Sequence, residues 1–260
     1  MNKDTNNSRI ILQAMELDKS FGGLKALDCI TFSLSEGRIS ALIGPNGAGK
    51  TTLLNVISGM EAPDSGRIFL EDSDITGLKT WEITKRGICR TFQSGRVFQN
   101  MTVLENVLTG MHTSANSGWL AGIFHWPWER KEEKELKTKA LGLLELFSLA
   151  DVAYEPVSNI PLILQRKLEI ARALGSSPKL LLLDEPVAGL NMKETEELGE
   201  TIRNLSRFRI TILLVEHDMN LVMSLADWII VLQHGQKIAE GKPLEIRNNP
   251  EVISAYLGNQ

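Results

Sequence analysis

The sequence has few cysteines and no long apolar run. Its 260 residues include two cysteines, Cys29 and Cys89, which lie far apart and lack the companion spacing of a zinc site or a disulfide framework. We expect both to be reduced thiols in a cytosolic protein. The longest apolar stretches, such as KLLLLDEP and WIIVLQ, have the length of a strand and fall short of the ~20 residues that cross a bilayer. The chain is therefore expected not to span a membrane by itself.

Neither sign of charge dominates the chain. Its 28 basic and 32 acidic side chains give a net charge of -4, which argues against a general surface for nucleic acid. The amino end, MNKDTNNSRI, is polar and lacks the apolar run of a signal peptide, so we interpret it as a frayed tail without an export signal. A content of 43% apolar and 23% charged residues is typical of a globular protein, here one domain with a sub-domain.

Short aliphatic runs alternate with helical patterns along much of the chain. The runs RISALIG, GRIFL, KLLLLD, ITILLVEH and DWIIVLQ have strand length, and the apolar ones lack polar alternation, as expected of parallel strands covered on both faces. Helical patterns include Lys50–Ser58, Met192–Ser206 and Met219–Leu225. The alternation predicts an α/β fold built on a parallel sheet with right-handed crossovers.

The middle of the chain differs from this pattern. Residues 102–174 contain no convincing strand and at least three helical stretches, which predicts a helical insertion. One stretch, ERKEEKELKTKALGLLELF, places Glu133 four residues before Lys137, and Glu135 four residues before Lys139, with leucines following on one face. We interpret its run of charges as a solvated helix face.

A glycine-rich loop follows the run RISALI. The residues GPNGAGKTT fit the pattern G-x-x-x-x-G-K-[ST] between a predicted strand and a predicted helix, which is the context that the motif requires. Its glycines let main-chain N–H groups curl around phosphate oxygens, Lys50 reaches the β- and γ-phosphates, and Thr51 can ligate Mg²⁺. The flanking elements disfavour the alternative of a plain glycine-rich turn, so we expect a nucleoside triphosphate as ligand. The predicted binding residues are Gly44, Pro45, Asn46, Gly47, Ala48, Gly49, Lys50, Thr51 and Thr52.

The run KLLLLDEP adds the second part of a phosphoryl-transfer site. Its strand ends in Asp184 and Glu185, at the carboxyl edge where open sheets bind their ligands. Asp184 would hold Mg²⁺, directly or through water, and Glu185 would polarise the attacking water. An acidic pair at a strand end is usually a solvated turn, but the presence of the phosphate loop favours catalysis.

Shorter motifs resemble those of ABC-type ATPases, from about Arg9 to the end of the chain. RTFQ ends in Gln93, which matches the glutamine of the family's Q-loop, and LLVEHD carries His217, which matches the switch histidine. AGLN stands where the D-loop should be, with Asn191 in place of the usual aspartate, and Phe21 matches the aromatic residue that stacks on adenine. The order and spacing of these motifs carry the resemblance. A hydrolase triad is the alternative, but no serine nucleophile elbow accompanies the carboxylate and histidine.

The resemblance implies an ATP-hydrolysing P-loop NTPase with a parallel-sheet core, an antiparallel β portion and a helical sub-domain. It implies that Gln93 contacts Mg²⁺ or water, that His217 reaches the γ-phosphate, and that Glu185 activates water. ATP and Mg²⁺ are the implied cofactors. A single domain would span residues 8–260, with a nucleotide-binding core at 8–93 and 176–243, a helical sub-domain at 94–175 and C-terminal helices at 244–260.

Within this family the chain most resembles the ATP-binding subunits of branched-chain amino-acid importers. The segments GICRTFQ, MTVLENVLTGMH, LEIARAL, DEPVAGLN and GQKIAEGKPLEIRNNPEVISAYLG carry this likeness. Transporter ATPases for urea and for lipopolysaccharide are related alternatives. The likeness implies integral-membrane permease subunits as partners at the cytoplasmic face of the inner membrane, an extracytoplasmic solute-binding protein acting through them, and no nucleic acid.

An aromatic segment lies inside the predicted helical insertion. GWLAGIFHWPWER holds Trp119, Phe124, Trp126 and Trp128 around Pro127. Core packing and an exposed docking patch for a membrane subunit are both open. We favour docking, because the helical sub-domain of ABC transporters receives a coupling helix from the permease near the Q-loop.

The segment NIPLIL departs from the family pattern. LEIARAL aligns it with the LSGGQ signature, which completes the ATP site on the phosphate loop of the opposite subunit in a head-to-tail pair. Ile160, Pro161, Leu162, Ile163 and Leu164 occupy the signature, and the importer group generally keeps a glycine where this chain has Ile163. A β-branched side chain restricts the backbone and its approach to the γ-phosphate, and the serine hydroxyl is missing. IPLIL can also be simply the first turn of a helix that tolerates an early proline.

The altered signature bears on the partner's site and leaves the chain's own phosphate loop untouched. Lys50, Glu185 and His217 could therefore work against an intact signature from a second ATP-binding subunit. This reasoning favours a heterodimer with one competent and one impaired site over a homodimer. A regulatory module that binds ATP and barely hydrolyses it is the alternative.

Overall fold

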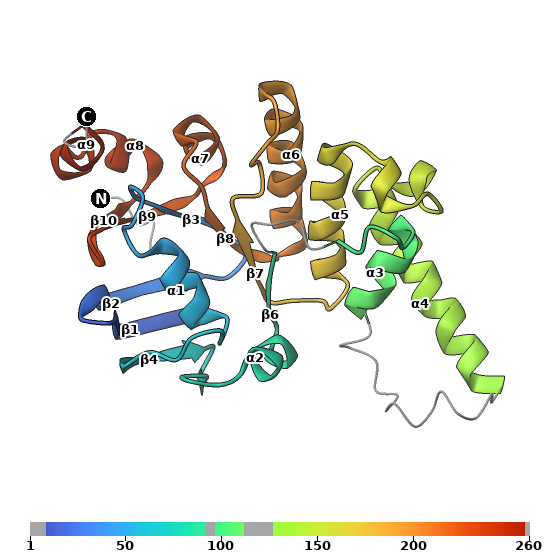
Figure 1. The fold of residues 1–260 in the computed structure, drawn as a ribbon, viewed down its shortest axis with the longest axis horizontal. Helices are drawn as coiled ribbons and strands as arrows, with labels where there is room; N and C mark the ends of the chain where they lie inside the picture. The colour runs from blue at the N-terminus through green and yellow to red at the C-terminus, as the bar shows by residue number, and fades with distance from the viewer. Residues whose placement is uncertain (1–8, 92–96, 112–126, 258–260) are drawn as a thin grey trace, which may run out of the picture.

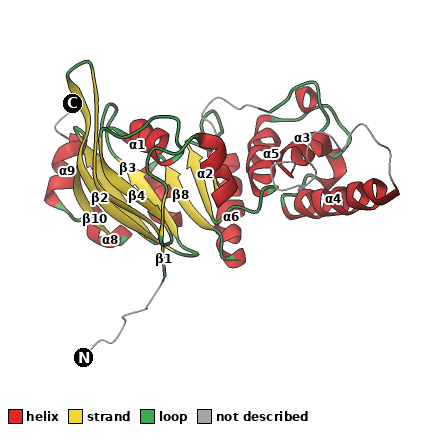
Figure 2. Ribbon diagram, turned by 90° about the horizontal axis from the view of Figure 1, so that it is seen from below, coloured by secondary structure: helices red, strands yellow, loops and turns green. Residues whose placement is uncertain are grey.

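The computed structural model describes residues 9–91, 97–111 and 127–257. In Figures 1 and 2 these residues form two sheets with helices around them, and a group of helices extends to one side. The strands are β1 (Ile10–Phe21), β2 (Leu24–Ser35), β3 (Ile39–Ile43), β4 (Ser65–Leu70), β5 (Ser73–Asp74), β6 (Ile88–Arg90), β7 (Leu180–Asp184), β8 (Thr211–Val215), β9 (Trp228–Gln233) and β10 (Gln236–Gly241). The helices are α1 (Lys50–Ile57), α2 (Thr80–Arg86), α3 (Val103–Met111), α4 (Pro127–Leu146), α5 (Leu162–Leu174), α6 (Met192–Leu205), α7 (Met219–Leu225), α8 (Pro243–Arg247) and α9 (Pro250–Leu257), with 3₁₀ turns η2 (Ala150–Val152), η3 (Val157–Asn159) and η4 (Ser206–Phe208).

The larger sheet of the described residues has six strands in the order β10, β9, β3, β8, β7, β6. Adjacent strands in this sheet run parallel, except that β9 and β10 pair antiparallel. Strands β3, β7 and β8 are buried along their whole length, so the prediction of apolar parallel strands is confirmed for RISALIG, KLLLLD and ITILLVEH. Both Leu42 and Asp184 pair with Val215, which brings the carboxyl ends of these three strands level. The loops that follow them therefore meet at one edge.

The smaller sheet, within the same described ranges, is antiparallel in the order β2, β1, β4, β5. The predicted run GRIFL forms β4 here and pairs antiparallel with β1, so it does not belong to the parallel sheet. The sequence patterns did not single out β1 and β2, because register shifts interrupt the alternation of buried and exposed residues. Glu16 and Cys29 lie at these irregularities with positive φ values of 50° and 54°.

The helical predictions are confirmed. Helices α1, α6 and α7 cover the ranges expected from the sequence, within one residue at each end. The stretch 102–174 contains α3, α4 and α5, and its described residues form no strand, only an isolated bridge between Thr102 and Pro156. The charged residues of α4 from Lys134 to Lys139 are exposed, as expected of a solvated face. No helix in the described ranges is both long and apolar enough to cross a bilayer.

Apolar side chains cover both faces of the larger sheet. One face packs against the smaller sheet and α1, through residues such as Leu42, Leu182 and Leu213. The opposite face packs partly against α5 and α6, through Leu183 and Leu214, and partly against α7 and α8. With both faces covered, the carboxyl edge is where a ligand has room to bind.

Candidate functional site

The glycine-rich loop joins β3 to α1, as the sequence predicted. Gly49 has a φ of 101° and caps α1, and a Cβ there would lie 2.5 Å from the carbonyl oxygen of Ala26. A Cβ on Gly44 would collide with the carbonyl oxygen of Leu232. The backbone therefore passes too close to its neighbours for side chains at these two positions. A Cβ on Gly47 would meet no other atom, but its φ of 78° lies in the left-handed region that favours glycine.

Lys50 is half-buried at the first residue of α1. Its Nζ donates hydrogen bonds to the carbonyl oxygens of Gly44, at 2.6 Å, and Pro45, at 3.0 Å. Burial lowers the pKa of this ammonium, while the charges of Glu185 and Asp184 oppose that shift. The ammonium thus lies against the loop and within electrostatic reach of the two acidic residues, where a polyphosphate would bring negative charge.

Asp184 ends β7 and is almost fully buried. Its Oδ2 accepts a hydrogen bond from Nη2 of Arg90, the last residue of β6, at 2.9 Å. The same guanidinium donates from Nη1 to Oδ1 of Asn55 in α1, at 2.8 Å, and to Oγ of Ser58, at 3.3 Å. Arg90 therefore ties β7 to the helix that follows the phosphate loop. The sequence reasoning missed this residue, although it is the first letter of the RTFQ motif.

Glu185 follows Asp184 in a strained backbone conformation. Its φ is +48°, in the left-handed region that residues with a side chain rarely adopt. Its N–H donates to the carbonyl oxygen of Val215 at 2.9 Å, and its carbonyl oxygen accepts from Ala188 at 3.1 Å. This geometry turns the chain sharply at the end of the strand, where the half-buried Glu185 side chain stands at the sheet edge.

His217 and Glu216 follow β8, the strand between β3 and β7. The His217 side chain is 67% exposed, with Nδ1 at 3.9 Å from Oε2 of Glu216. Glu216 has no exposed surface, and burial raises the pKa of its carboxyl group although two main-chain N–H groups bond to it. Sequence reasoning singled out His217 and overlooked Glu216, whose only signal was its place beside the histidine in LLVEHD.

The remaining predicted site residues in the described part of the chain are Phe21, Thr51 and Thr52. Phe21 ends β1 with 45% of its surface exposed, and Nζ of Lys19 lies 5.3 Å from the centre of its ring. Thr51 and Thr52 occupy the first turn of α1, and Thr51 is exposed. Gln93 lies outside the described residues, so its place relative to the loop stays a prediction.

The residues fit a nucleotide with Mg²⁺. The glycine loop offers main-chain donors and an ammonium for phosphates, and a threonine hydroxyl and a carboxylate are the oxygen ligands that Mg²⁺ accepts. Among the described residues, no three His, Cys, Asp or Glu side chains cluster to hold a metal unaided. This suits an ion that takes part of its coordination from substrate phosphates.

The segment aligned with the signature forms the start of α5. Pro161 is the residue before the helix, with φ -56° and ψ 155°, and no side chain caps this end. Ile160 and Ile163 are buried in the core shared with α3, whereas Leu162 is 41% exposed. The interpretation of IPLIL as a first helical turn therefore fits the local conformation, and the Ile163 side chain points into the core.

Leu162 contacts the loop after β7. A Cβ on Gly189, whose φ is 84°, would lie 3.2 Å from Cδ2 of Leu162. Two residues later Asn191 caps α6: its Oδ1 accepts from the N–H of Glu194 at 3.0 Å, and Glu194 accepts from the N–H of Asn191 at 2.9 Å. Asparagine and aspartate are about equally good N-cap residues, so Asn191 can cap α6 in place of the aspartate usual in the family.

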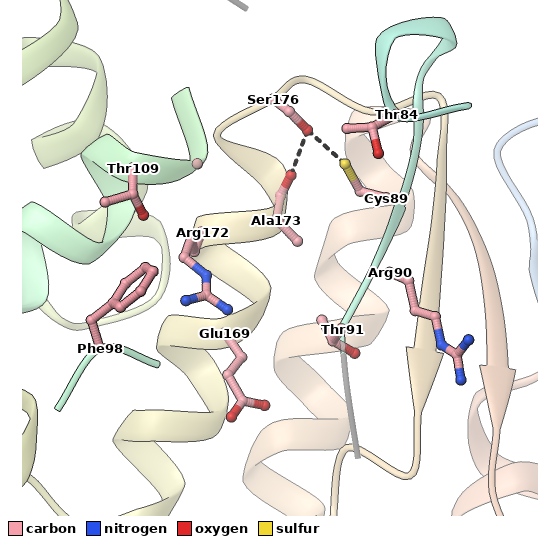
Figure 3. A pocket seen from close by; sticks show the side chains of 11 residues that line it. Thr84, Cys89, Arg90, Thr91, Phe98, Thr109, Glu169, Arg172, Ala173 and Ser176 are labelled. Atoms are coloured by element: carbon pink, nitrogen blue, oxygen red, sulfur yellow. Dashed lines mark hydrogen bonds between the residues drawn. The ribbon is translucent and has the colours of Figure 1, made fainter. Parts of the chain in front are cut away.

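A cavity of about 370 Å³ lies between β6 and the helices α3 and α5 (Figure 3). Cys89 and Ser176 share a hydrogen bond of 2.8 Å on one wall, and Arg172 lies 5.6 Å from the ring centre of Phe98 on the other. Burial raises the pKa of the Cys89 thiol and of the Glu169 carboxyl, which also lines the cavity. Cys29 is exposed and Cys89 is buried, and no disulfide joins them. The aromatic segment at 119–126 lies outside the described residues, and of Trp128 only its place in α4 is described.

Comparison with known proteins decides the family. The family model described as "ABC transporter" matches residues 27–188. The chain belongs to the ABC transporter family. A model described as "Branched-chain amino acid ATP-binding cassette transporter" also matches this ABC ATPase, at residues 236–260.

Named relatives of this ABC ATPase cover almost its whole length. The high-affinity branched-chain amino acid transport ATP-binding protein BraF of Pseudomonas aeruginosa is 44% identical, over 96% of this chain and 99% of BraF. LivG of Escherichia coli, with the same description, has the same identity and coverage. The probable LivG of Archaeoglobus fulgidus is 40% identical, over 96% of each chain.

Solved structures support the same assignment. A nucleotide-free ATP-binding cassette from an ABC transporter superposes with a TM-score of 0.83 at 36% identity, covering 95% of this chain and 98% of that one. The ADP conformation of an ATP-binding cassette gives 0.84 at 35% identity, covering 96% and 99%. The predicted P-loop fold with mixed sheets and helices is confirmed, and the chain is an ABC ATPase of the kind that energises transport.

Proposed function

We propose that this ABC ATPase hydrolyses ATP to drive an importer for branched-chain amino acids. The observation that carries the ATPase part is the meeting of the phosphate loop, Asp184, Glu185 and His217 at the level ends of β3, β7 and β8. The solute rests on the relatives, which are named for branched-chain amino acid transport and match 96% of the chain. An importer for urea or another solute is the alternative, and it would use the same ATP site.

We assign the roles in ATP hydrolysis from this geometry. Lys50 gives up its bonds to the carbonyl oxygens of Gly44 and Pro45 and binds phosphate oxygens instead. Glu185 orients and polarises the attacking water, and His217, exposed at the sheet edge, contacts the γ-phosphate. Gln93 is assigned to the same site from its motif alone, and Phe21 to stacking on adenine.

Mg²⁺ is the cofactor that this arrangement fits. Bound beside the phosphates, it would neutralise charge that develops during phosphoryl transfer. Thr51, Asp184 and Gln93 are its proposed ligands. Asp184 uses Oδ2 for Arg90, which orients the carboxylate and leaves Oδ1 for the metal or its water.

We propose a heterodimer with a second ATP-binding subunit. The start of α5 has neither the serine hydroxyl nor the glycine of a complete signature, and that end serves the partner's phosphate loop. Lys50, Glu185 and His217 then work against the intact signature of the second subunit. A homodimer would place the altered end at both sites.

The proposed membrane partner is a permease at the cytoplasmic face, to which this subunit binds peripherally. We propose that the permease docks at the cavity that Thr91, Phe98 and Arg172 line, since Thr91 is the last described residue before Gln93 in the sequence (Figure 3). The aromatic residues of 119–128 are a further proposed part of this surface. A solute-binding protein would act through the permease, without touching this chain.

The test is ATP hydrolysis by the purified chain over a range of protein concentrations, with nucleotide binding measured in parallel. Hydrolysis that appears only when a second ATP-binding subunit is added supports the heterodimer, and specific activity that rises with concentration of the chain alone contradicts it. Glu185→Gln should keep binding and lose almost all turnover. Binding without turnover in every assembly would instead support an ATP-dependent regulatory switch, which the missing signature hydroxyl favours as the alternative.

A further inference from the structure

Glu216 is a fully buried carboxylate to which the proposed mechanism gives no role. It follows β8 and precedes His217, and none of its surface reaches solvent. One oxygen bonds the loop after β7, and the other bonds the next residue in its own loop. Oε1 accepts the N–H of Val187 at 3.2 Å, and Oε2 accepts the N–H of His217 at 3.2 Å.

These two N–H groups belong to the loops that carry the proposed catalytic side chains. Val187 lies two residues after Glu185, in the turn that begins with the strained φ of +48°. The N–H of Glu185 is held by the carbonyl oxygen of Val215, the residue directly before Glu216. Two consecutive residues at the end of β8 therefore hold both sides of that turn, one through its main chain and one through its side chain.

We propose that Glu216 is a positioning residue that sets the turn of Glu185 and the loop of His217 at a fixed separation. The proposal rests on the proposed function, since it takes Glu185 and His217 as the residues that act on ATP. The His217 side chain is 67% exposed and the backbone of Glu185 is strained, so both segments need support from elsewhere. The carboxylate below them supplies that support from the interior.

The hydrogen-bonding capacity of the Glu216 side chain predicts which substitutions keep each bond. Both partners of Glu216 are N–H donors, so both of its oxygens must accept. An amide of the same size has one oxygen and one NH₂ group, and the NH₂ would face an N–H. Glu216→Gln therefore keeps the volume and one bond and loses the other. Glu216→Asp keeps the carboxylate but is one methylene shorter, so it too should reach only one loop.

The experiment compares Glu216→Gln with Glu245→Gln in the full chain, assembled with the subunits that support its hydrolysis. Glu245 also accepts a main-chain N–H, that of Lys242 at 2.8 Å, but in α8 away from the site. We expect Glu216→Gln to lower kcat by up to about 100-fold, because a small misplacement of catalytic groups has effects of that size. The KM for ATP and the nucleotide affinity should change less than about threefold, because the phosphate loop is intact. Glu245→Gln should leave both parameters unchanged.

Hydrogen exchange gives a second readout that does not depend on turnover. The amides of Val187 and His217 should be protected in the unaltered protein and exchange faster in Glu216→Gln, while the amide of Ile212, bonded to the carbonyl oxygen of Arg38 near the start of β8, serves as reference. If Glu216→Gln does not fold, two measurements still test the proposal: the kcat of Glu216→Asp, and the protection of the two amides in the unaltered protein. An unchanged kcat in a folded variant, or unprotected Val187 and His217 amides, overturns the proposal. Undiminished hydrolysis by Glu185→Gln would instead overturn the proposed function.

Discussion

The guanidinium of Arg90 donates a hydrogen bond to the carboxylate of Asp184 across 2.9 Å, with both side chains buried. Residues 94 positions apart in the chain thus form one buried ion pair at the floor of the proposed metal site. Because the pair is shielded from solvent, loss of either charge leaves the other buried without its compensation.

Arg90→Met should therefore lower the free energy of unfolding by about 3 kcal/mol, the usual cost of breaking a buried pair from one side. Asp184→Asn in the same chain should recover part of this loss, because it removes the uncompensated charge. Urea denaturation of the nucleotide-free protein measures both. Arg9→Met is the matched control, since its pair with Glu71 is exposed and should contribute less than about 1 kcal/mol. Equal effects of the two substitutions would contradict this account.

Lys50→Met should weaken ATP binding by roughly 10- to 100-fold, since a hydrogen bond to a charged group contributes about 1.5–3 kcal/mol. The fold should survive, because Lys50 is only half-buried and methionine keeps most of its aliphatic length. Titration with a fluorescent nucleotide gives the affinity. Lys237→Met, which removes a surface pair with Glu240, is the control and should bind as the unaltered protein does. Unchanged affinity of Lys50→Met would remove the residue from the site.

Pro161→Ser should stabilise the protein by about 0.5–1 kcal/mol. Pro161 is the residue before α5 and offers no side-chain cap, whereas a serine hydroxyl there can accept a free N–H of the first turn. The same hydroxyl would restore one donor to the signature, so hydrolysis by the chain alone should rise with protein concentration. Thermal unfolding and ATPase assays test the two parts, with Pro161→Ala as control. A gain shared by the alanine variant would show that the hydroxyl is not responsible.

The stability of the protein should depend on Asp18 at low pH. Hydrogen bonds from Lys25, Ser65 and the N–H of Cys29 lower the pKa of this carboxyl from 3.8 to about 2. A lowered pKa contributes stability that is present above pH 3.8 and is lost as the pH falls towards 2. Between those values the unfolding midpoint should fall more steeply for the unaltered protein than for Asp18→Asn. Parallel pH profiles of the two proteins would count against the hydrogen bonds as the cause.

Much of the molecule follows from local patterns in the chain. The phosphate loop was predicted because its glycines, Lys50 and the flanking strand and helix form one continuous segment. The apolar strands β3, β7 and β8 were predicted because strands covered on both faces are apolar throughout. Strands β1 and β2 escaped prediction, since their register shifts break the alternation by which a half-exposed strand is recognised.

The sequence by itself determined the family, the phosphate-binding loop and the identity of the acidic residues and the histidine, because each belongs to a short motif with its own local geometry. The tertiary structure decided which side chains support them. Arg90 meets Asp184, and Glu216 meets Val187, only because the sheet places β6 beside β7 and β7 beside β8. Strand order depends on how distant segments pack, and no local pattern records which strand will be the neighbour.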